Sequence, residues 1–209
     1  MRFGALTALH RTQIAWPEIA EPAVAAQRFV APFSLTRMTW IKPSFRWMMH
    51  RSGWATKPGQ EHVLAVRITR AGWEEALSRA VLTTPEARVY SSYEQWREVF
   101  DRAVVRVQWD PEYAVCDDKL DHRSIQVGLS RNVIRRYVNE WTVEIRDLTV
   151  RTHEISAHVR SGQVGQAEAL LPPERPYPLD DELAKSIGAS SPRDPDGARR
   201  AIQAEGNDG

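Results

Sequence analysis

The middle of the chain alternates between strand-like and helix-like spacing of its apolar residues. His62–Ile68 is a β-branched apolar run and predicts a buried strand. Thr69 follows it directly and can cap a helix. The apolar face of that helix would consist of Trp73, Ala76, Leu77, Ala80 and Val81. The pattern therefore predicts a helix that continues to about residue 81.

A second helix is predicted after Ser91, because Ser91 and Glu94 have capping-box spacing. Its apolar residues are Trp96, Val99 and Phe100. Residues 103–109 then predict another strand. We expect Asp110-Pro111 to end this strand, since proline restricts the residue before it and has no N–H to donate.

Residues 122–129 alternate in the way that is typical of a strand with one buried face. Ile125, Val127 and Leu129 would face one way, and Ser124, Gln126 and Gly128 the other. A helix from Ser130 is predicted next, with an apolar side made of Val133, Ile134, Tyr137, Val138 and Trp141. Residues 142–149 predict either a last strand or an extension of the preceding element.

Prolines mark two helices nearer the N-terminus. Pro17 and Pro22 start or break a short alanine-rich helix. Pro43 followed by Ser44 can open a helix that runs to about Arg51. Gly53 is its natural stop, because glycine readily adopts the left-handed conformation found just after helices.

Strands and helices mix here without a strict βαβ repeat, which favours an α+β fold over a doubly wound sheet. We expect a single compact α+β domain over residues 1–171, built on a mixed sheet with helices. From about Leu171 four prolines predict an extended connector, and the end of the chain has few apolar residues to bury. Residues 172–209 are therefore expected to form a Pro-rich connector and a disordered tail.

Composition narrows the class of protein. The hydrophobic fraction of 42% is enough for a real core, and the formal net charge of +1 argues against a general nucleic-acid coat. Cys116 is the single cysteine, which excludes an internal disulfide and indicates a reducing, cytoplasmic setting. No apolar run approaches the roughly 18 residues of a membrane span, so we expect no membrane contact. The oligomeric state is not predicted.

Positive charge is concentrated between residues 37 and 54. This segment combines four cations, three tryptophans and three hydroxyls, namely Arg37, Lys42, Arg46, Arg51, Trp40, Trp47, Trp54, Thr39, Ser44 and Ser52. No Asp or Glu lies between Glu21 and Glu61. Cations and hydroxyls hold phosphate and indole faces accept stacking, so the segment suits a nucleotide or an exposed base. The alternative is a buried aromatic ridge with solvated arginines between its members.

A second candidate site lies on the strand predicted at residues 122–129. Its polar positions are Arg123, Ser124, Gln126 and Gly128, where an amide and a guanidinium are expected to point together. Glycine in a strand allows another group to approach the backbone closely. The alternative is that these positions are only the solvent side of the strand.

Other chemistry is disfavoured. The acidic stretch from Cys116 to His122 lacks the ligand spacing of a zinc or EF-hand site. His153 and His158 are five residues apart and would diverge on a helix. No nucleophile elbow, phosphate loop or dinucleotide fingerprint occurs. We expect no metal, and kinase, NTPase and classical dehydrogenase functions are disfavoured.

A set of motifs along the chain is specific enough to indicate a family. It consists of Pro32-Phe33-Ser34, Arg37 to Phe45, Trp47-Met48-Met49, Arg51 to Trp54, Lys57 to Gln60, Trp109-Asp110-Pro111 and Arg123 to Leu129. With these motifs the chain resembles an uncharacterised family, the domain-of-unknown-function family 4291, over roughly residues 15–150. At the front, Gln13-Ile14-Ala15-Trp16 departs from the Tyr-Gln-Ala-Tyr motif usual in that family.

The order of motifs is also similar to that of the ADP-ribosyltransferases that modify DNA bases. Lys42-Pro43-Ser44, Met48-Met49, Trp109 and Arg123 to Gln126 occur in the corresponding order. The resemblance implies NAD as a substrate and cleavage of its nicotinamide–ribose bond. Lys42, Arg37 or Arg51 would hold the pyrophosphate and Trp40 or Trp47 the nicotinamide. Gln126 stands where that family has its catalytic glutamate, although an amide cannot act as a base.

Two functional hypotheses follow. The first is an enzyme that uses NAD to modify a nucleotide or nucleic-acid base. Its catalytic positions would be Gln126 and Lys42, and its NAD-binding residues would be Arg37, Thr39, Trp40, Ser44, Trp47, Arg51 and Arg123. The second is a non-catalytic module that binds a nucleotide or single-stranded nucleic acid.

Overall fold

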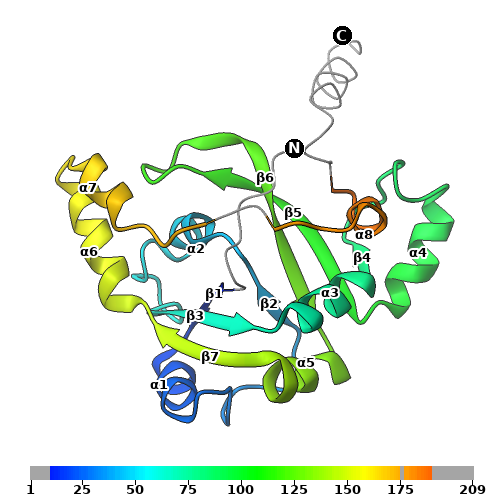
Figure 1. Ribbon diagram of the computed structural model, residues 1–209, viewed down its shortest axis with the longest axis horizontal. Coiled ribbons are helices and arrows are strands. Elements are labelled where there is room, and N and C mark those ends of the chain that lie inside the picture. Colours follow the sequence, from blue (N-terminus) through cyan, green and yellow to red (C-terminus); the bar gives the residue numbers. More distant parts are fainter. Residues whose placement is uncertain (1–9, 175–176, 190–209) are drawn as a thin grey trace.

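Two β-sheets form the body of the computed structural model, which describes residues 10–174 and 177–189 (Figure 1). One sheet has the order β1-β3-β7 and the other β2-β6-β5-β4. The strands are β1 (His10–Ala15), β2 (Thr39–Ile41), β3 (His62–Ile68), β4 (Ala80–Leu82), β5 (Val105–Tyr113), β6 (Lys119–Leu129) and β7 (Thr142–Asp147). All neighbours are antiparallel except β4 and β5. The α+β class and a mixed sheet are confirmed, with the strands divided between two sheets.

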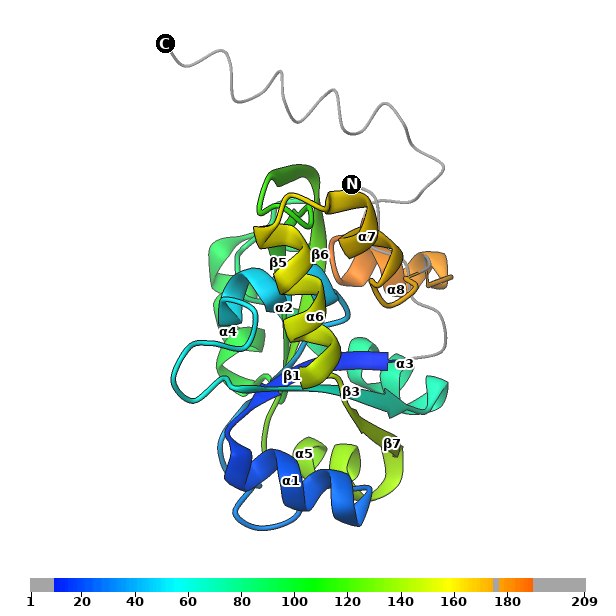
Figure 2. The same cartoon turned by 90° about the vertical axis from the view of Figure 1, so that its left-hand side faces the viewer.

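Helices pack against these sheets. They are α1 (Pro17–Ala26), α2 (Phe45–Ser52), α3 (Arg70–Ser78), α4 (Tyr93–Arg102), α5 (Asn132–Arg136), α6 (Thr149–Arg160), α7 (Val164–Ala169) and α8 (Asp181–Ser186), with a π-helical turn η1 (Tyr137–Trp141) after α5. Helix α2 contacts both β1 and β5. Figure 2 shows α6 in front of α2 and of the three-stranded sheet. A small apolar core lies there, in which Phe45 and Met48 of α2 share a cluster with Ile155 and Ala167.

Several local predictions are confirmed. The strand at residues 62–68 has the predicted bounds, and the Thr69 hydroxyl accepts a hydrogen bond from the Gly72 N–H at the start of α3. Ser44 caps α2 by accepting from the Trp47 N–H, and Gly53 ends that helix with a φ of 59°. The segment left open at residues 142–149 contains a strand, β7, which pairs with β3.

The predicted end of α3 is wrong. The helix stops at Ser78, and Ala80 and Val81 belong to the short strand β4 instead. β4 pairs in parallel with β5, and Ala80 lies opposite Val105. Leu82, two residues further along β4, is almost completely buried. Pairing with the sheet outweighs the helical spacing of these apolar residues, because a tertiary contact overrides a weak local preference.

The cap of α4 lies one residue later than the pattern predicts. Ser92 is the capping residue and accepts from the Gln95 N–H, while the Gln95 side chain accepts from the Ser91 N–H. Gln95 therefore takes the role expected of Glu94, and glutamine serves this role as well as glutamate.

The predicted end of β5 is also wrong. The strand passes through Asp110-Pro111 and continues to Tyr113, and β6 begins at Lys119 rather than at His122. β4 pairs only with residues 105–107, so β5 beyond this point has a single neighbouring strand. Proline is tolerated on such an edge because one side of the strand needs no N–H donor. This extension places Asp110 and Glu112 on the sheet.

The main core extends past residue 171. Tyr177 and Ile187 are buried in the same cluster as residues of both sheets, and the Trp109 indole N–H donates to the Ile187 carbonyl at 2.8 Å. The expected boundary between domain and connector thus does not mark the end of the packed structure. Of the connector and tail predicted over residues 172–209, residues 175–176 and 190–209 lie outside the described residues.

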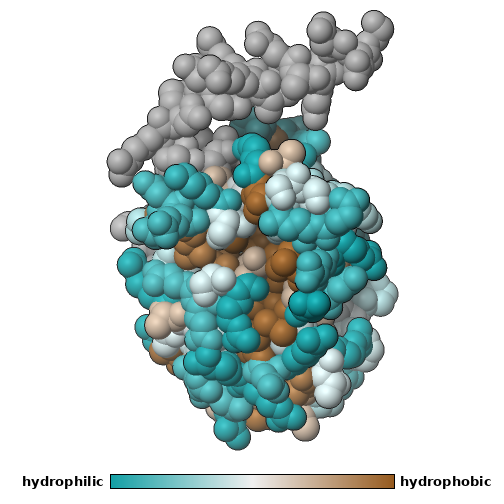
Figure 3. All heavy atoms as spheres, turned by 90° about the vertical axis from the view of Figure 1, so that its right-hand side faces the viewer, coloured by the Kyte–Doolittle hydropathy of each residue, from teal (hydrophilic) through white to brown (hydrophobic). Residues whose placement is uncertain are grey.

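On the side that carries α4, an apolar strip runs between hydrophilic margins (Figure 3). Within residues 10–174 and 177–189, no helix has the length and apolar character needed to cross a bilayer.

Candidate functional site

The site is organised around a buried ammonium at the end of β2. Lys42 is 1% exposed. Its Nζ donates to Asp110 Oδ2 at 2.9 Å and to the Ser124 carbonyl at 3.2 Å, and it lies 4.4 Å from the centre of the Trp47 ring. Burial lowers the pKa of Lys42 below its ordinary value, against the opposing effect of Asp110. The three contacts occupy the ammonium, so it is not a free cation for a phosphate.

Strand β5 brings a row of polar side chains to this ammonium. Gln108 and Asp110 alternate along the strand and therefore share one face of the sheet, and Glu112 follows at a register shift between Pro111 and Tyr113. Gln108 Nε2 donates to Asp110 Oδ1 at 2.7 Å, so both oxygens of Asp110 have partners. Asp110 lies opposite Ser124 of β6, and Gln108 lies opposite Gln126. The polar face thus extends over both strands.

Glu112 is the most unusual member of this row. Its side chain is completely buried, and Oε1 accepts from the Ser44 hydroxyl at 2.8 Å and from the Tyr113 N–H at 3.0 Å. The other oxygen, Oε2, is buried without a hydrogen-bond partner among the described residues. The Ser124 hydroxyl is in the same situation. Such orphaned polar atoms are rare in folded proteins, and a catalytic role, an ion or a water can explain one.

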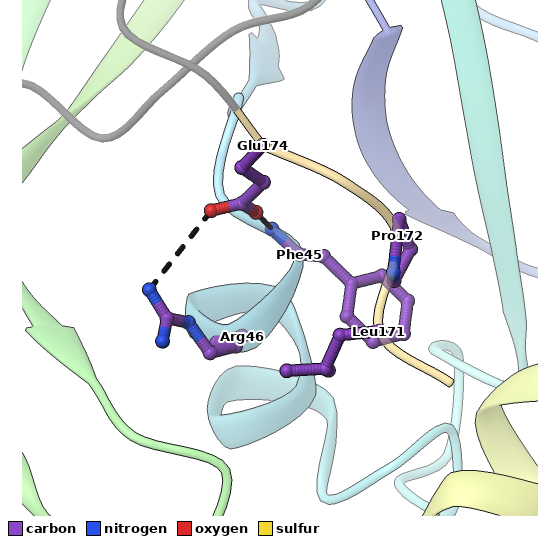
Figure 4. A pocket seen from close by; sticks show the side chains of 5 residues that line it. All are labelled: Phe45, Arg46, Leu171, Pro172 and Glu174. Atoms are coloured by element: carbon purple, nitrogen blue, oxygen red, sulfur yellow. Dashed lines mark hydrogen bonds and ion pairs between the residues drawn. The ribbon is translucent and has the colours of Figure 1, made fainter. Parts of the chain in front are cut away.

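A third carboxylate reaches the site from the far end of the chain. Glu174 Oε1 accepts from the Phe45 N–H at 2.9 Å, and its Oε2 lies 4.0 Å from the guanidinium of Arg46 (Figure 4). Burial raises the pKa of Glu174, and the nearby charge of Glu112 adds to the effect. A pocket of about 180 Å³ lies beside it, lined by Phe45, Arg46, Leu171, Pro172 and Glu174.

The structure brings part of the predicted site together. Lys42, Ser44 and Trp47 meet at the junction of β2 and α2. Trp40 lies opposite Gly128, and a Cβ added at Gly128 would be 2.9 Å from the Trp40 ring. The Trp40 indole therefore covers Gly128, on the same face as the half-buried Gln126.

Four other predicted residues lie elsewhere. Thr39 is buried and, by strand alternation, faces away from Trp40 and Lys42. Arg123 alternates with Ser124 and so leaves the sheet on the face opposite to Gln126, which corrects the expectation that the two point together. The remaining two are arginines at the surface, Arg37 and Arg51.

These two arginines flank the site without entering it. Arg37 is exposed ahead of β2, and Lys42 follows the end of that strand. Arg51 is exposed in the last turn of α2, about 10 Å along the axis from the start of the helix. Neither guanidinium forms an ion pair with the part of the chain that the structure describes.

Sequence reasoning missed the three carboxylates. The sequence contains a pattern that could have indicated Asp110 and Glu112, because polar residues recur at every second position from Gln108 past Pro111. No sequence pattern indicates Glu174, since its contact with Phe45 spans 129 positions.

The acidic stretch from Cys116 to His122 spans the turn between β5 and β6 and the first residues of β6. Cys116 is exposed there, and Asp117 Oδ1 lies 3.1 Å from His50 Nδ1. Among the described residues, no three His, Cys, Asp or Glu side chains are grouped so that they could hold a metal ion.

A protein-family model matches most of this chain. A family model described as "Domain of unknown function (DUF4291)" matches residues 11–177. The chain belongs to this family. The match is longer than the expected resemblance and covers every residue of the candidate site described above, Glu174 among them. No curated protein and no solved structure matches the chain.

Proposed function

We propose that this DUF4291 domain is an ADP-ribosyltransferase-like enzyme that uses NAD to modify a nucleotide or a nucleic-acid base. The observation that carries the proposal is Glu112, a fully buried carboxylate with one oxygen held by Ser44 and the other without a partner. Glu112 takes the catalytic role for which Gln126 lacks a basic group.

The charge of the cluster supports this chemistry. Asp110, Glu112 and Glu174 bring three carboxylates together, against the buried ammonium of Lys42 and the more distant guanidinium of Arg46. Cleavage of the nicotinamide–ribose bond builds positive charge on the ribose, and a fixed carboxylate stabilises such a transition state. A cluster with an excess of carboxylates therefore suits this reaction.

The proposed reaction is a substitution at the ribose C1′ of NAD. The C1′–N bond breaks and its electron pair leaves with neutral nicotinamide. A nucleophilic atom of the acceptor forms the new bond to C1′, and the proton it loses passes to Oε2 of Glu112. Gln126 and Gln108 offer amides for ribose hydroxyls, and the partly exposed indoles of Trp40 and Trp47 offer stacking surfaces for the rings.

Lys42 has a positioning role in this proposal. Its three contacts hold Asp110, Ser124 and Trp47 in fixed relation, so it acts through them rather than on the substrate. The pyrophosphate is assigned instead to the start of α2, where Arg46 and backbone N–H groups supply positive charge.

The test is release of nicotinamide from NAD in the presence of single-stranded oligonucleotides. Glu112→Gln should lower kcat by about 10²-fold or more at an almost unchanged KM, because it removes the base and keeps the shape. Glu98→Gln, an exposed carboxylate of α4, is the matched control and should behave as the wild type. Wild-type turnover by Glu112→Gln would refute the assignment.

A non-catalytic nucleotide or single-stranded nucleic-acid module is the second candidate. The exposed guanidinium groups of Arg37 and Arg51, which lack ion-pair partners among the described residues, favour it. Salt-sensitive binding of oligonucleotides without nicotinamide release would support this candidate over the first.

A further inference from the structure

The segment after α7 crosses the start of α2 and closes one side of the site. Residues 171–174, which we call the strap, run back over the N-terminal end of that helix (Figures 1 and 4). Leu171 and Pro172 line the pocket with Phe45, and the strap ends at Glu174. The strap thus lies where a ligand would approach the polar face from α2.

The strap places a negative charge at the end of a helix that attracts anions. The Phe45 N–H belongs to the first turn of α2 and has no acceptor within the helix, and it donates to Glu174 instead. The positive end of the helix dipole and the Arg46 guanidinium lie at the same place. Main-chain N–H groups at a helix start, together with an arginine, form a typical phosphate-binding arrangement.

A second observation also indicates that a ligand belongs here. Ser44, the residue directly before Phe45, holds one oxygen of the buried Glu112 and leaves Oε2 without a partner among the described residues. A sugar hydroxyl is a donor that suits this acceptor. An acceptor for a hydroxyl beside a site for an anion matches a sugar phosphate.

We infer that Glu174 is an internal substitute for a phosphate group and that the strap is a displaceable cover of the phosphate subsite. The ligand class is a nucleoside diphosphate or a dinucleotide. Its phosphate replaces the Glu174 carboxylate at the Phe45 N–H and at Arg46, and its ribose hydroxyl supplies the donor that Glu112 lacks. This inference rests on the proposed function and adds to it the place of the phosphate and a built-in competitor.

Burial of the Glu174 carboxylate agrees with a contact that a ligand can replace. Its surroundings oppose its charge, through loss of water and through the neighbouring Glu112, so the pKa of Glu174 is raised. The carboxylate is thus held less firmly than its hydrogen bond alone suggests. A ligand that also satisfies Glu112 gains an interaction that the strap cannot provide.

The test is calorimetric binding of inorganic pyrophosphate to the full chain and to Glu174→Gln. The amide keeps the acceptor for the Phe45 N–H but removes the charge that competes with phosphate. Where the strap covers the subsite in about nine molecules of ten, uncovering it should tighten the apparent Kd about tenfold. Glu168→Gln, an exposed carboxylate on α7, makes the same change in net charge and should bind as the wild type.

A third variant locates the effect. Adding Arg46→Gln to Glu174→Gln should abolish the gain, because it removes the arginine of the subsite. Equal affinity of Glu174→Gln and wild type, or an equal gain in Glu168→Gln, would overturn the inference. A gain that survives Arg46→Gln would also overturn it.

The binding experiment is independent of turnover. Tighter pyrophosphate binding by Glu174→Gln without any nicotinamide release would retain the subsite and refute the enzymatic function. Nicotinamide release that depends on Glu112, with unchanged pyrophosphate affinity in Glu174→Gln, would retain the enzyme and refute the strap.

Discussion

Lys42 Nζ lies 2.9 Å from Asp110 Oδ2, and this ion pair is buried. It reaches from the end of β2 across β6 to β5, with the Ser124 carbonyl of β6 as a further acceptor. Removing one partner of a buried pair leaves the other charge unpaired in a low-dielectric environment. We therefore expect Lys42→Ala to lower the free energy of unfolding by about 3–5 kcal/mol, measured by urea denaturation.

A matched pair at the surface controls for the loss of a cation. Arg97 and Asp101 form an ion pair on α4 in which both side chains are more than half exposed, so Arg97→Ala should leave stability almost unchanged. Replacing both partners, as Lys42→Met with Asp110→Leu, should recover part of the loss, because neither charge of this pair remains buried while the buried Glu112 still loses the nearby ammonium. A Lys42→Ala variant as stable as the wild type would contradict the buried pair. Because Lys42→Ala is expected to be less stable, a loss of activity in that variant does not by itself identify a catalytic lysine.

Glu174 gives the stability of the protein a defined pH dependence. Burial raises its pKa in the folded state above the ordinary value of 4.5. Between these two pKa values the folded state binds more protons than the unfolded state, so the contribution of Glu174 to stability falls as pH rises through that window. Glu174→Gln should lack this contribution, and its stability relative to the wild type should increase as the pH rises from 4.5 towards the raised pKa.

Urea denaturation of both proteins across this range measures the difference, and the other titrating groups cancel in the comparison. Glu168→Gln should run parallel to the wild type, because Glu168 is exposed. A difference between Glu174→Gln and wild type that is constant with pH would show that the Glu174 carboxyl is not perturbed.

Gly128 is required by the indole that covers it. A Cβ at this position would lie 2.9 Å from both the Trp40 ring and the Met38 sulfur, which is closer than real Cβ contacts. Gly128→Ala should displace the Trp40 ring, cost about 1–3 kcal/mol and shift the indole N–H resonance of Trp40 in NMR spectra. Gly165→Ala is the control, since its Cβ would meet nothing within 4 Å. There alanine should leave stability equal or raise it by up to about 1 kcal/mol.

The parts of the fold that sequence predicted are those with a local cause. The strand at His62–Ile68 and the caps at Thr69, Ser44 and Gly53 depend on residues within a few positions of one another. The errors arose where a distant strand decides. β4 replaces the last turn of a predicted helix because β5 offers it a partner, and Pro111 lies within a strand because that edge has no neighbour.

The candidate site shows the same division. Lys42, Ser44 and Trp47 were identified because they are close in sequence, and the structure keeps them together. The prediction that Lys42 is an unpaired cation was wrong. Acidic residues are absent nearby in sequence, but Asp110, which pairs with Lys42, lies 68 positions away. A segment that looks cationic along the chain has its central lysine neutralised in the fold.

The exposed arginines provide the test that separates the two proposed functions. Arg37 and Arg51 are free of ion pairs within the described residues, so phosphates of a bound single strand can pair with both. If the chain is a single-strand binding module, the logarithm of affinity should fall linearly with the logarithm of salt concentration. Arg37→Ala and Arg51→Ala should each reduce that slope by about one. Arg97→Ala on α4 should leave the slope unchanged, because Arg97 is already paired with Asp101.

Fluorescence anisotropy of a labelled oligonucleotide measures the slope. An affinity that stays flat between about 50 and 200 mM salt would exclude single-strand binding as the main function. In that case the remaining proposal is the NAD reaction, whose carboxylates lie on the sheet face and not at these arginines.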